Sequence, residues 1–209
     1  MSKEIDVVIL TKSSKNGGYC VAGIDVNSSK WVRLVSSDTR SHGALFDRDM
    51  QYRNNTFFNL LDVVRVPVLR KVPSEHQPEN ILIDEEEYWE KIGELSISDV
   101  LELHPPETHR FLLGNEYPYI TEERVDTVGH SLILVKVSDL IITHPRERTT
   151  KASFRYRFTT YENMSVTDRD FYNTPDQTEL GDAVLIMSLP DTPYPERKYF
   201  KFIAKLFPL

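Results

Sequence analysis

Short β-rich runs separated by tight-turn residues are the feature that most constrains the fold of this chain. Residues 5–12 (IDVVILTK), 19–26 (YCVAGIDV) and 30–37 (KWVRLVSS) are rich in valine and isoleucine, and Asn-Gly-Gly and Asn-Ser-Ser stand between them. Glycine and asparagine supply the positive φ that hairpin turns need. A fourth β-rich run covers 60–72, where Pro67 is typical of an edge strand or a bulge. Three strands in a meander, irregular chain and then another strand predict a small Greek-key barrel.

The second and third runs also predict which side chains share a face. If residues 27–29 form a three-residue turn, Ile24 lies opposite Val32 on an aliphatic face. Side chains alternate between the two faces of a strand, so Trp31 and Arg33 fall on the other face. We therefore expect the indole and the guanidinium to point away from the interior, onto a surface open to solvent.

The middle of the chain changes character. Residues 73–130 carry 3 basic and 15 acidic side chains, whereas 1–72 carry 11 basic and 7 acidic ones. The acidic run 85–87, followed by apolar residues at approximate helical spacing, and the segment 98–103 before two prolines predict two short helices. We expect residues 73–115 to form an acidic helical connector.

β-rich runs return in the last part of the chain. They cover residues 131–143, 151–158, 161–168, 181–189 and 197–207. The run KASFRYRF alternates, which predicts that Phe154, Tyr156 and Phe158 are core residues and that Arg155 and Arg157 face outward. The Thr-Thr pair that follows is a candidate hairpin turn. The predicted domains are thus an N-terminal OB-like barrel (1–72), the connector (73–115) and a C-terminal OB-like barrel (116–209), in a mainly β fold.

Composition restricts the cellular setting and the chemistry. The net charge is −7, but the acidity is concentrated in the middle block, and the single cysteine, Cys20, leaves no internal disulfide. Absence of a signal-like N-terminus or a long apolar run predicts a cytoplasmic protein that is not in a membrane. The six histidines show no metal-binding spacing, so we expect no metal and no cofactor.

Several short segments together resemble a known family. Residues 15–23 (KNGGYCVAG), 31–33 (WVR), 165–168 (SVTD) and 200–204 (FKFIA) are similar to motifs of a bacterial family described as carrying a dual OB-containing domain. Position 34 is leucine, where members of the family tend to have proline. The resemblance implies two five-stranded barrels and a nucleic-acid-binding role, and it brings no catalytic residues with it.

The candidate binding residues follow from where OB-folds hold their ligands, across strands 2 and 3 and between the loops joining strands 1–2 and 4–5. On this basis the candidates are Lys12, Lys15, Tyr19, Trp31, Arg33, Arg155 and Arg157. Structural alternatives exist: Trp31 would pack against the connector or the second barrel, Arg33 would pair with Asp25, and the Gly-Gly stretch would be only a hairpin corner.

The predicted function is a non-enzymatic binding module, since no set of residues forms a catalytic constellation. Its expected ligand is single-stranded DNA or RNA, bound through the strand 2–3 face of the first barrel. The alternative is a protein-interaction module in which residues 85–87, with Tyr88 and Trp89, dock a basic protein partner.

Overall fold

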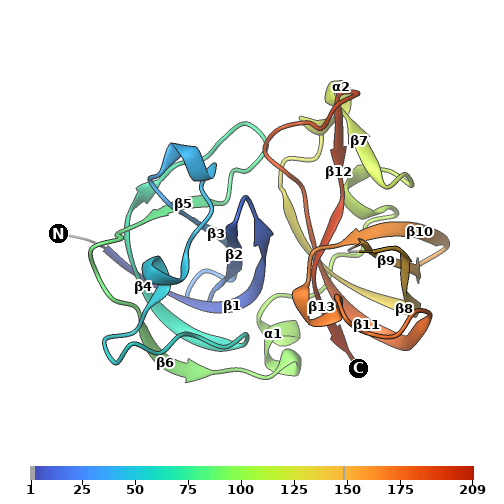
Figure 1. The fold of residues 1–209 in the computed structure, drawn as a ribbon. Helices are drawn as coiled ribbons and strands as arrows, with labels where there is room; N and C mark the ends of the chain where they lie inside the picture. Colours follow the sequence, from blue (N-terminus) through green and yellow to red (C-terminus); the bar gives the residue numbers. More distant parts are fainter. Residues whose placement is uncertain (1–2, 148) are drawn as a thin grey trace. The chain divides into compact units, whose positions relative to one another are not determined.

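The computed structural model describes residues 3–147 and 149–209, which divide into two compact units. The first unit takes the chain as far as Pro73 and then adds Glu79–Pro105; the second consists of Ser74–Pro78 and Pro106–Leu209 (Figure 1). The stretch predicted as a separate connector, 73–115, is therefore shared out between the two units. No helix in the described part of the chain has the length and apolarity to cross a bilayer.

The first unit is built around a ring of five strands. The five strands are β1 (Lys3–Lys15), β2 (Gly18–Asp25), β3 (Lys30–Val35), β4 (Asp62–Lys71) and β5 (Asn80–Ile83). Neighbouring strands follow the order β1-β2-β3-β5-β4, and a further pairing of β4 with β1 closes the ring. Strands β3 and β5 run parallel, and the other pairs in the ring are antiparallel. Short 3₁₀ turns at Thr39–Ser41 and Asp47–Met50 lie between β3 and β4.

The β1–β2 corner has the turn chemistry that the sequence predicts. Lys15 pairs with Gly18, which leaves Asn16 and Gly17 as a two-residue turn with φ of 46° and 81°. Positive φ at both positions is the hairpin geometry that asparagine and glycine favour. Gly18 is required for a different reason, because a Cβ there would lie 2.5 Å from the carbonyl oxygen of Leu45.

The β2–β3 register differs from the prediction by one residue. Ile24 pairs with Trp31, and Asp25 pairs with Lys30, so the turn has four residues. The Asp25 carboxylate holds this longer turn by accepting from the amide of Asn27 at 2.9 Å and the hydroxyl of Ser28 at 2.8 Å. A shift of one residue exchanges the faces of one strand relative to the other. The barrel interior therefore receives Val21 with Val32 and Leu34, and the outer face receives Cys20, Ala22 and Ile24 with Trp31 and Arg33.

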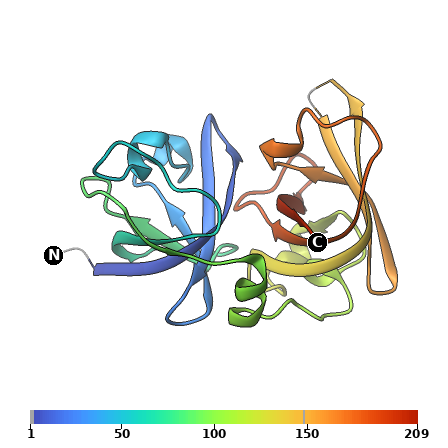
Figure 2. The same ribbon diagram turned by 90° about the horizontal axis from the view of Figure 1, so that it is seen from below.

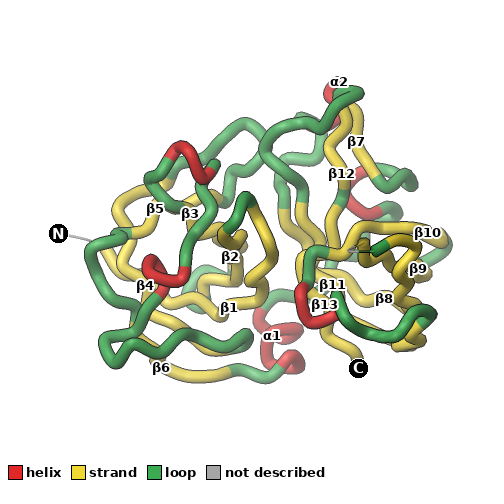
Figure 3. Tube along the Cα trace, viewed as in Figure 1, coloured by secondary structure: helices red, strands yellow, loops and turns green. Residues whose placement is uncertain are grey.

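The acidic stretch contains a strand where a helix was predicted. Strand β6 (Glu90–Glu94) pairs antiparallel with β4, and one helix, α1 (Ile97–Leu103), follows it (Figure 3). The prediction of a short helix at 98–103 is confirmed, and the prediction of a helix at 85–95 is wrong. Tertiary packing decides the difference, because Trp89 is 1% exposed and stacks on Phe58 with ring centroids 5.5 Å apart. That indole belongs to the core of the first barrel.

The second unit repeats the topology of the first. Its ring of strands consists of β8 (Leu132–Arg146), β9 (Thr149–Tyr156), β10 (Thr159–Val166), β11 (Thr178–Ser188) and β13 (Phe202–Pro208). They form a closed barrel in the order β10-β13-β11-β8-β9, with β10 and β13 parallel. In chain order these are the first to fifth strands of the same five-stranded arrangement, so β9 and β10 correspond to β2 and β3.

Smaller elements complete the second unit. They are the 3₁₀ turns Leu112–Gly114 and Arg169–Phe171, the helix α2 (Glu122–Val125), and the strands β7 (Tyr119–Thr121) and β12 (Lys198–Phe200), which pair antiparallel. The predicted strand over 197–207 is thus divided into β12 and β13, with Lys201 between them. The short helix α2 was not predicted.

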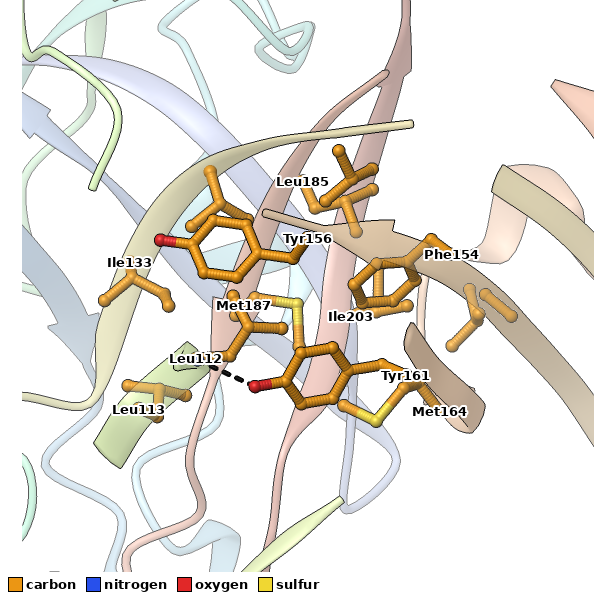
Figure 4. Packing of buried hydrophobic residues seen from close by; sticks show 14 of the residues in the cluster. Leu112, Leu113, Ile133, Phe154, Tyr156, Tyr161, Met164, Leu185, Met187 and Ile203 are labelled. Atoms are coloured by element: carbon orange, nitrogen blue, oxygen red, sulfur yellow. Dashed lines mark hydrogen bonds between the residues drawn. The ribbon is translucent and has the colours of Figure 1, made fainter. Parts of the chain in front are cut away.

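The core of the second barrel contains two of the three aromatic residues assigned to it from the sequence. Phe154 and Tyr156 are 1% and 2% exposed, and Phe154 stacks on Tyr161 with centroids 5.7 Å apart (Figure 4). Phe158 is 95% exposed, so its assignment to the core is wrong. Tyr156 pairs with Thr159, which makes Arg157 and Phe158 the two-residue hairpin turn in place of the Thr-Thr pair.

Candidate nucleic-acid interface

The first-barrel candidates on β3 do not lie on an open surface. Arg33 is 2% exposed, and its guanidinium donates to the sulfur of Cys20 at 2.7 Å. Trp31 is half-buried, with its ring edge-on to His104 at 5.5 Å, and His104 in turn bonds the carbonyl oxygen of Ser29 at 2.9 Å. The prediction that this pair faces solvent is wrong for Arg33, and Trp31 packs against the residue that ends helix α1.

The candidates on β1 and β2 form a cation–aromatic cluster. The ammonium of Lys12 lies 4.3 Å from the ring centroid of Tyr19 and 5.4 Å from that of Phe58. The same ammonium pairs with Asp47 at 3.0 Å. Lys12 is thus neutralised by a neighbouring carboxylate, and Lys15 flanks the Asn-Gly turn as a partly buried side chain. The hairpin-corner alternative accounts for this geometry without a bound anion.

Strands β9 and β10 present a polar outer face that is open. Lys151, Ser153 and Arg155 point outward between the buried residues of β9, and Arg155 is exposed, as predicted. The register brings three outward pairs into contact across the two strands. Lys151 donates to the hydroxyl of Ser165 at 2.8 Å, the amide of Asn163 donates to Ser153 at 3.3 Å, and Arg155 pairs with Thr160. Partial burial lowers the pKa of Lys151.

Arg157 and Phe158 stand at one end of this face, at the tip of the β9–β10 hairpin. In Figure 2 this hairpin, in orange, projects from the second barrel on the side away from the β8–β9 turn. The Arg157 guanidinium donates to the carbonyl oxygen of Thr108 at 2.8 Å, which leaves most of the side chain exposed. The phenyl ring of Phe158 is free in solvent.

Lys151 and Phe158 are the candidates that the sequence analysis missed. A two-residue turn at 157–158 would have exposed the ring, but the Thr-Thr pair that follows was the more obvious turn. Lys151 continues the alternation of Arg155 along the outer face, and extending the alternation to the start of the strand would have identified it.

The acidic residues proposed to dock a basic partner are partly engaged within the first unit. The Glu85 carboxylate accepts from the hydroxyl of Ser36 at 2.6 Å and from the amide of Ser37 at 2.7 Å. Glu86, Glu87 and Tyr88 are exposed, and Trp89 is not available because it is buried in the core.

Among the residues that the structure describes, one group of three could offer ligands to a metal ion. Glu75, His76 and Asp126 place their ligand atoms within 4.8 Å of one another. His76 lies 3.4 Å from the Asp126 carboxylate and edge-on to Tyr199 at 4.9 Å. An ion pair and a ring contact account for this arrangement.

Two of the motif segments near the C-terminus hold the second barrel together. The Asp168 carboxylate is buried; it pairs with Lys205 at 3.1 Å and accepts from the amide of Leu206 at 3.1 Å. Burial raises the pKa of Asp168, and the Lys205 ammonium opposes that rise.

Lys201 has the same structural role on the other side of the barrel. It is 1% exposed and donates to the carbonyl oxygens of Leu112 and Asn115, each at 2.7 Å, and to the Asn115 side chain at 2.8 Å. Burial lowers the pKa of Lys201 to about 7. Both lysines are therefore structural and not available to a ligand.

Comparison with known proteins places this architecture. One matching solved structure is a murine DNA-binding protein bound to double-stranded DNA, 8% identical, which aligns over 99% of this chain and 100% of its own with a TM-score of 0.40. No curated protein matches the chain. The family described as the dual OB-containing domain matches residues 5–206, in agreement with the two repeated five-stranded rings. The chain belongs to the dual OB-containing domain family.

Proposed function

We propose that this protein is a non-enzymatic binding module for single-stranded nucleic acid and that the strand crosses the outer face of β9 and β10. These are the second and third strands of an OB barrel, the position at which OB-folds hold oligonucleotides. The basic and aromatic groups of that face are of the kinds that bind phosphates and stack on bases.

The observation that carries this proposal is a difference in exposure between equivalent faces. On β2 and β3 of the first barrel, Ala22, Ile24 and Arg33 are at most 2% exposed. On β9 and β10 of the second barrel, Arg155 and the hairpin-tip residues Arg157 and Phe158 are exposed. A ligand needs an accessible surface, so the contact belongs on the second barrel.

The chemistry of the face suits a single strand bound with modest affinity. Lys151, Arg155 and Arg157 can donate to phosphates, and the Phe158 ring can stack on a base, which contributes roughly 1–3 kcal/mol per base in proteins of this kind. Glu162 is also exposed on β10 and repels phosphate. With few cations, the affinity should be moderate and should fall as salt rises.

Fluorescence anisotropy with labelled single-stranded DNA and RNA tests the proposal. We expect binding at low salt that weakens at moderate salt. The double variant Arg155→Ala/Arg157→Ala should weaken binding and reduce the salt slope by roughly 2, one for each lost phosphate contact. Phe158→Ala should weaken binding without a change in the salt slope.

The matched control is Arg70→Ala/Lys71→Ala, which removes two exposed cations from β4 of the first barrel. It has the same effect on net charge and should leave binding nearly unchanged. No binding at micromolar protein in low salt would sink the proposal. Equal losses in the two double variants would show that only net charge matters and would contradict the assigned face.

A second candidate function is a protein-interaction module. Glu86, Glu87 and Tyr88 are exposed together on the turn before β6, and Ile92 on β6 is 40% exposed. A basic partner would meet carboxylates beside apolar surface there. Pull-down of a partner that is lost with Glu86→Lys/Glu87→Lys and retained with Arg155→Ala/Arg157→Ala would favour this function.

A further inference from the structure

The second unit contains a cavity beside the β9–β10 hairpin. Its volume is about 270 Å³. Phe111, Leu113, Val128, Ile133 and Tyr156 supply apolar walls, and Glu107, His109, Arg110 and His130 supply polar groups. Pockets for drug-sized ligands are usually about 300–1,000 Å³, so this cavity suits a single ring system better than a larger molecule.

Hydrogen bonds to β8 and β9 fix the walls of the cavity. The amide of Glu107 donates to the carbonyl oxygen of Leu134 at 2.8 Å. The Tyr156 hydroxyl donates to the carbonyl oxygens of His109 at 2.8 Å and Glu107 at 3.1 Å. Figure 4 shows this hydroxyl directed away from Phe154, on the side of Ile133. The segment 107–109 is thus anchored to the barrel.

The polar groups suit the edges of a planar heterocycle. The Glu107 carboxylate lies 3.1 Å from the His109 ring, and the Arg110 guanidinium lies 4.8 Å from the Phe111 ring centroid. A carboxylate can accept from the exocyclic amino group of a base, and an aromatic ring or an arginine plane can stack on its face. An apolar slot with polar groups at its rim matches a nucleobase, which has apolar faces and polar edges.

The cavity is also adjacent to the proposed binding face. Arg157 at the hairpin tip donates to the carbonyl oxygen of Thr108, which lies between the cavity residues Glu107 and His109. Tyr156, which directly precedes Arg157, forms part of the cavity wall. A strand that follows the β9–β10 face and passes the hairpin tip therefore reaches the cavity.

We propose that this cavity receives one unstacked base of the bound single strand, with the amino edge of the base toward Glu107. The inference rests on the proposed function and specifies how the strand is held there. Sequence-tolerant contacts along the β9–β10 face would then be supplemented by one position that senses the base.

Oligonucleotides with a single abasic nucleotide, moved along the strand, test this inference by anisotropy. In the wild-type protein, an abasic nucleotide at one position should lower the affinity about tenfold, the order expected for one stacked base. Val128→Trp, which fills the cavity from a partly buried wall, should lower the affinity for the intact strand by a similar factor and remove the sensitivity to the abasic position. Thermal unfolding reports whether this variant folds.

Glu107→Leu gives an independent readout if Val128→Trp fails to fold. It should weaken binding of an oligo-dC strand several-fold more than binding of an oligo-dT strand, because thymine has no amino group. Glu116→Leu, at an exposed glutamate of the same unit, is the matched control and should affect the two strands equally.

The outcomes separate the two proposals. If the strand binds and Arg155→Ala/Arg157→Ala weakens it, but no abasic position matters and Glu107→Leu treats dC and dT alike, the cavity inference is overturned and the face remains. If no strand binds the wild-type protein at low salt, both are overturned. Capture of free nucleotides by the cavity without strand binding would overturn the proposed function alone.

Discussion

Arg155 and Asp139 form an ion pair on the outer surface of the second barrel, with the guanidinium 3.1 Å from the carboxylate. The two side chains are 58% and 66% exposed, and Arg155 also donates to the hydroxyl of Ser138 at 3.3 Å. Exposed pairs of this kind contribute roughly 0–1 kcal/mol, so a phosphate can take the place of Asp139 at little cost. The aspartate nevertheless competes with a nucleic acid for the arginine.

Asp139→Asn should therefore strengthen binding of single-stranded DNA at low salt, by up to about fivefold, which corresponds to a surface pair of roughly 1 kcal/mol. Asp139 has a φ of 55°, a conformation that asparagine tolerates, so the fold should be unaffected. Anisotropy titration measures the change. Glu86→Gln, at an exposed position of the first unit, changes the net charge equally and should have a smaller effect. Unchanged or weaker binding by Asp139→Asn would count against Arg155 as a phosphate contact.

Trp31→Phe should leave the affinity for single-stranded nucleic acid within about twofold of the wild type, because base stacking needs an exposed ring. The indole is half-buried and lies against His104, so its replacement acts on the packing of the first unit. Anisotropy and thermal unfolding are measured side by side. A loss of affinity as large as that of Phe158→Ala, with an unchanged melting temperature, would return the binding site to the first barrel.

Lys201→Met should destabilise the protein by roughly 1–3 kcal/mol, the cost of leaving buried hydrogen-bonding groups unsatisfied. The three oxygen atoms that lose their donor belong to Leu112 and Asn115. Urea denaturation measures the effect. Lys198→Met is the control, since Lys198 pairs with the exposed Glu196 and should cost about 0.5 kcal/mol or less. Equal effects of the two substitutions would contradict a structural role for Lys201.

The stability of the protein should also depend on pH through Lys201. Its pKa is lowered to about 7 in the folded protein by burial, whereas a lysine in an unfolded chain titrates near 10.4. Between these values the unfolded state binds more protons, so the free energy of unfolding rises with pH. From pH 7 to 9, the wild type should gain stability relative to Lys201→Met, by at most about 1.4 kcal/mol per pH unit. Identical pH dependence in the two proteins would mean that Lys201 keeps an ordinary pKa.

Local patterns predicted most of the strands and several of the turns. The valine- and isoleucine-rich runs became β1 to β4, and Asn16 with Gly17 formed the expected corner, because β-branched side chains and positive-φ residues act through their own backbone. The alternation around Arg155 correctly separated Phe154 and Tyr156 in the core from the outward arginine. The same local evidence could not distinguish a three-residue from a four-residue turn before β3.

The sequence by itself determined that this chain makes two β-rich units, since alternation, turn residues and apolar content are properties of short segments. Only the tertiary structure decided that Trp89 belongs to a barrel core, that Arg33 is buried beside Cys20, and that Phe158 stands exposed at a hairpin tip. Each of these outcomes depends on strand register and on which elements pack over a face. Register and packing are set by contacts between residues far apart in the chain, which no short pattern contains.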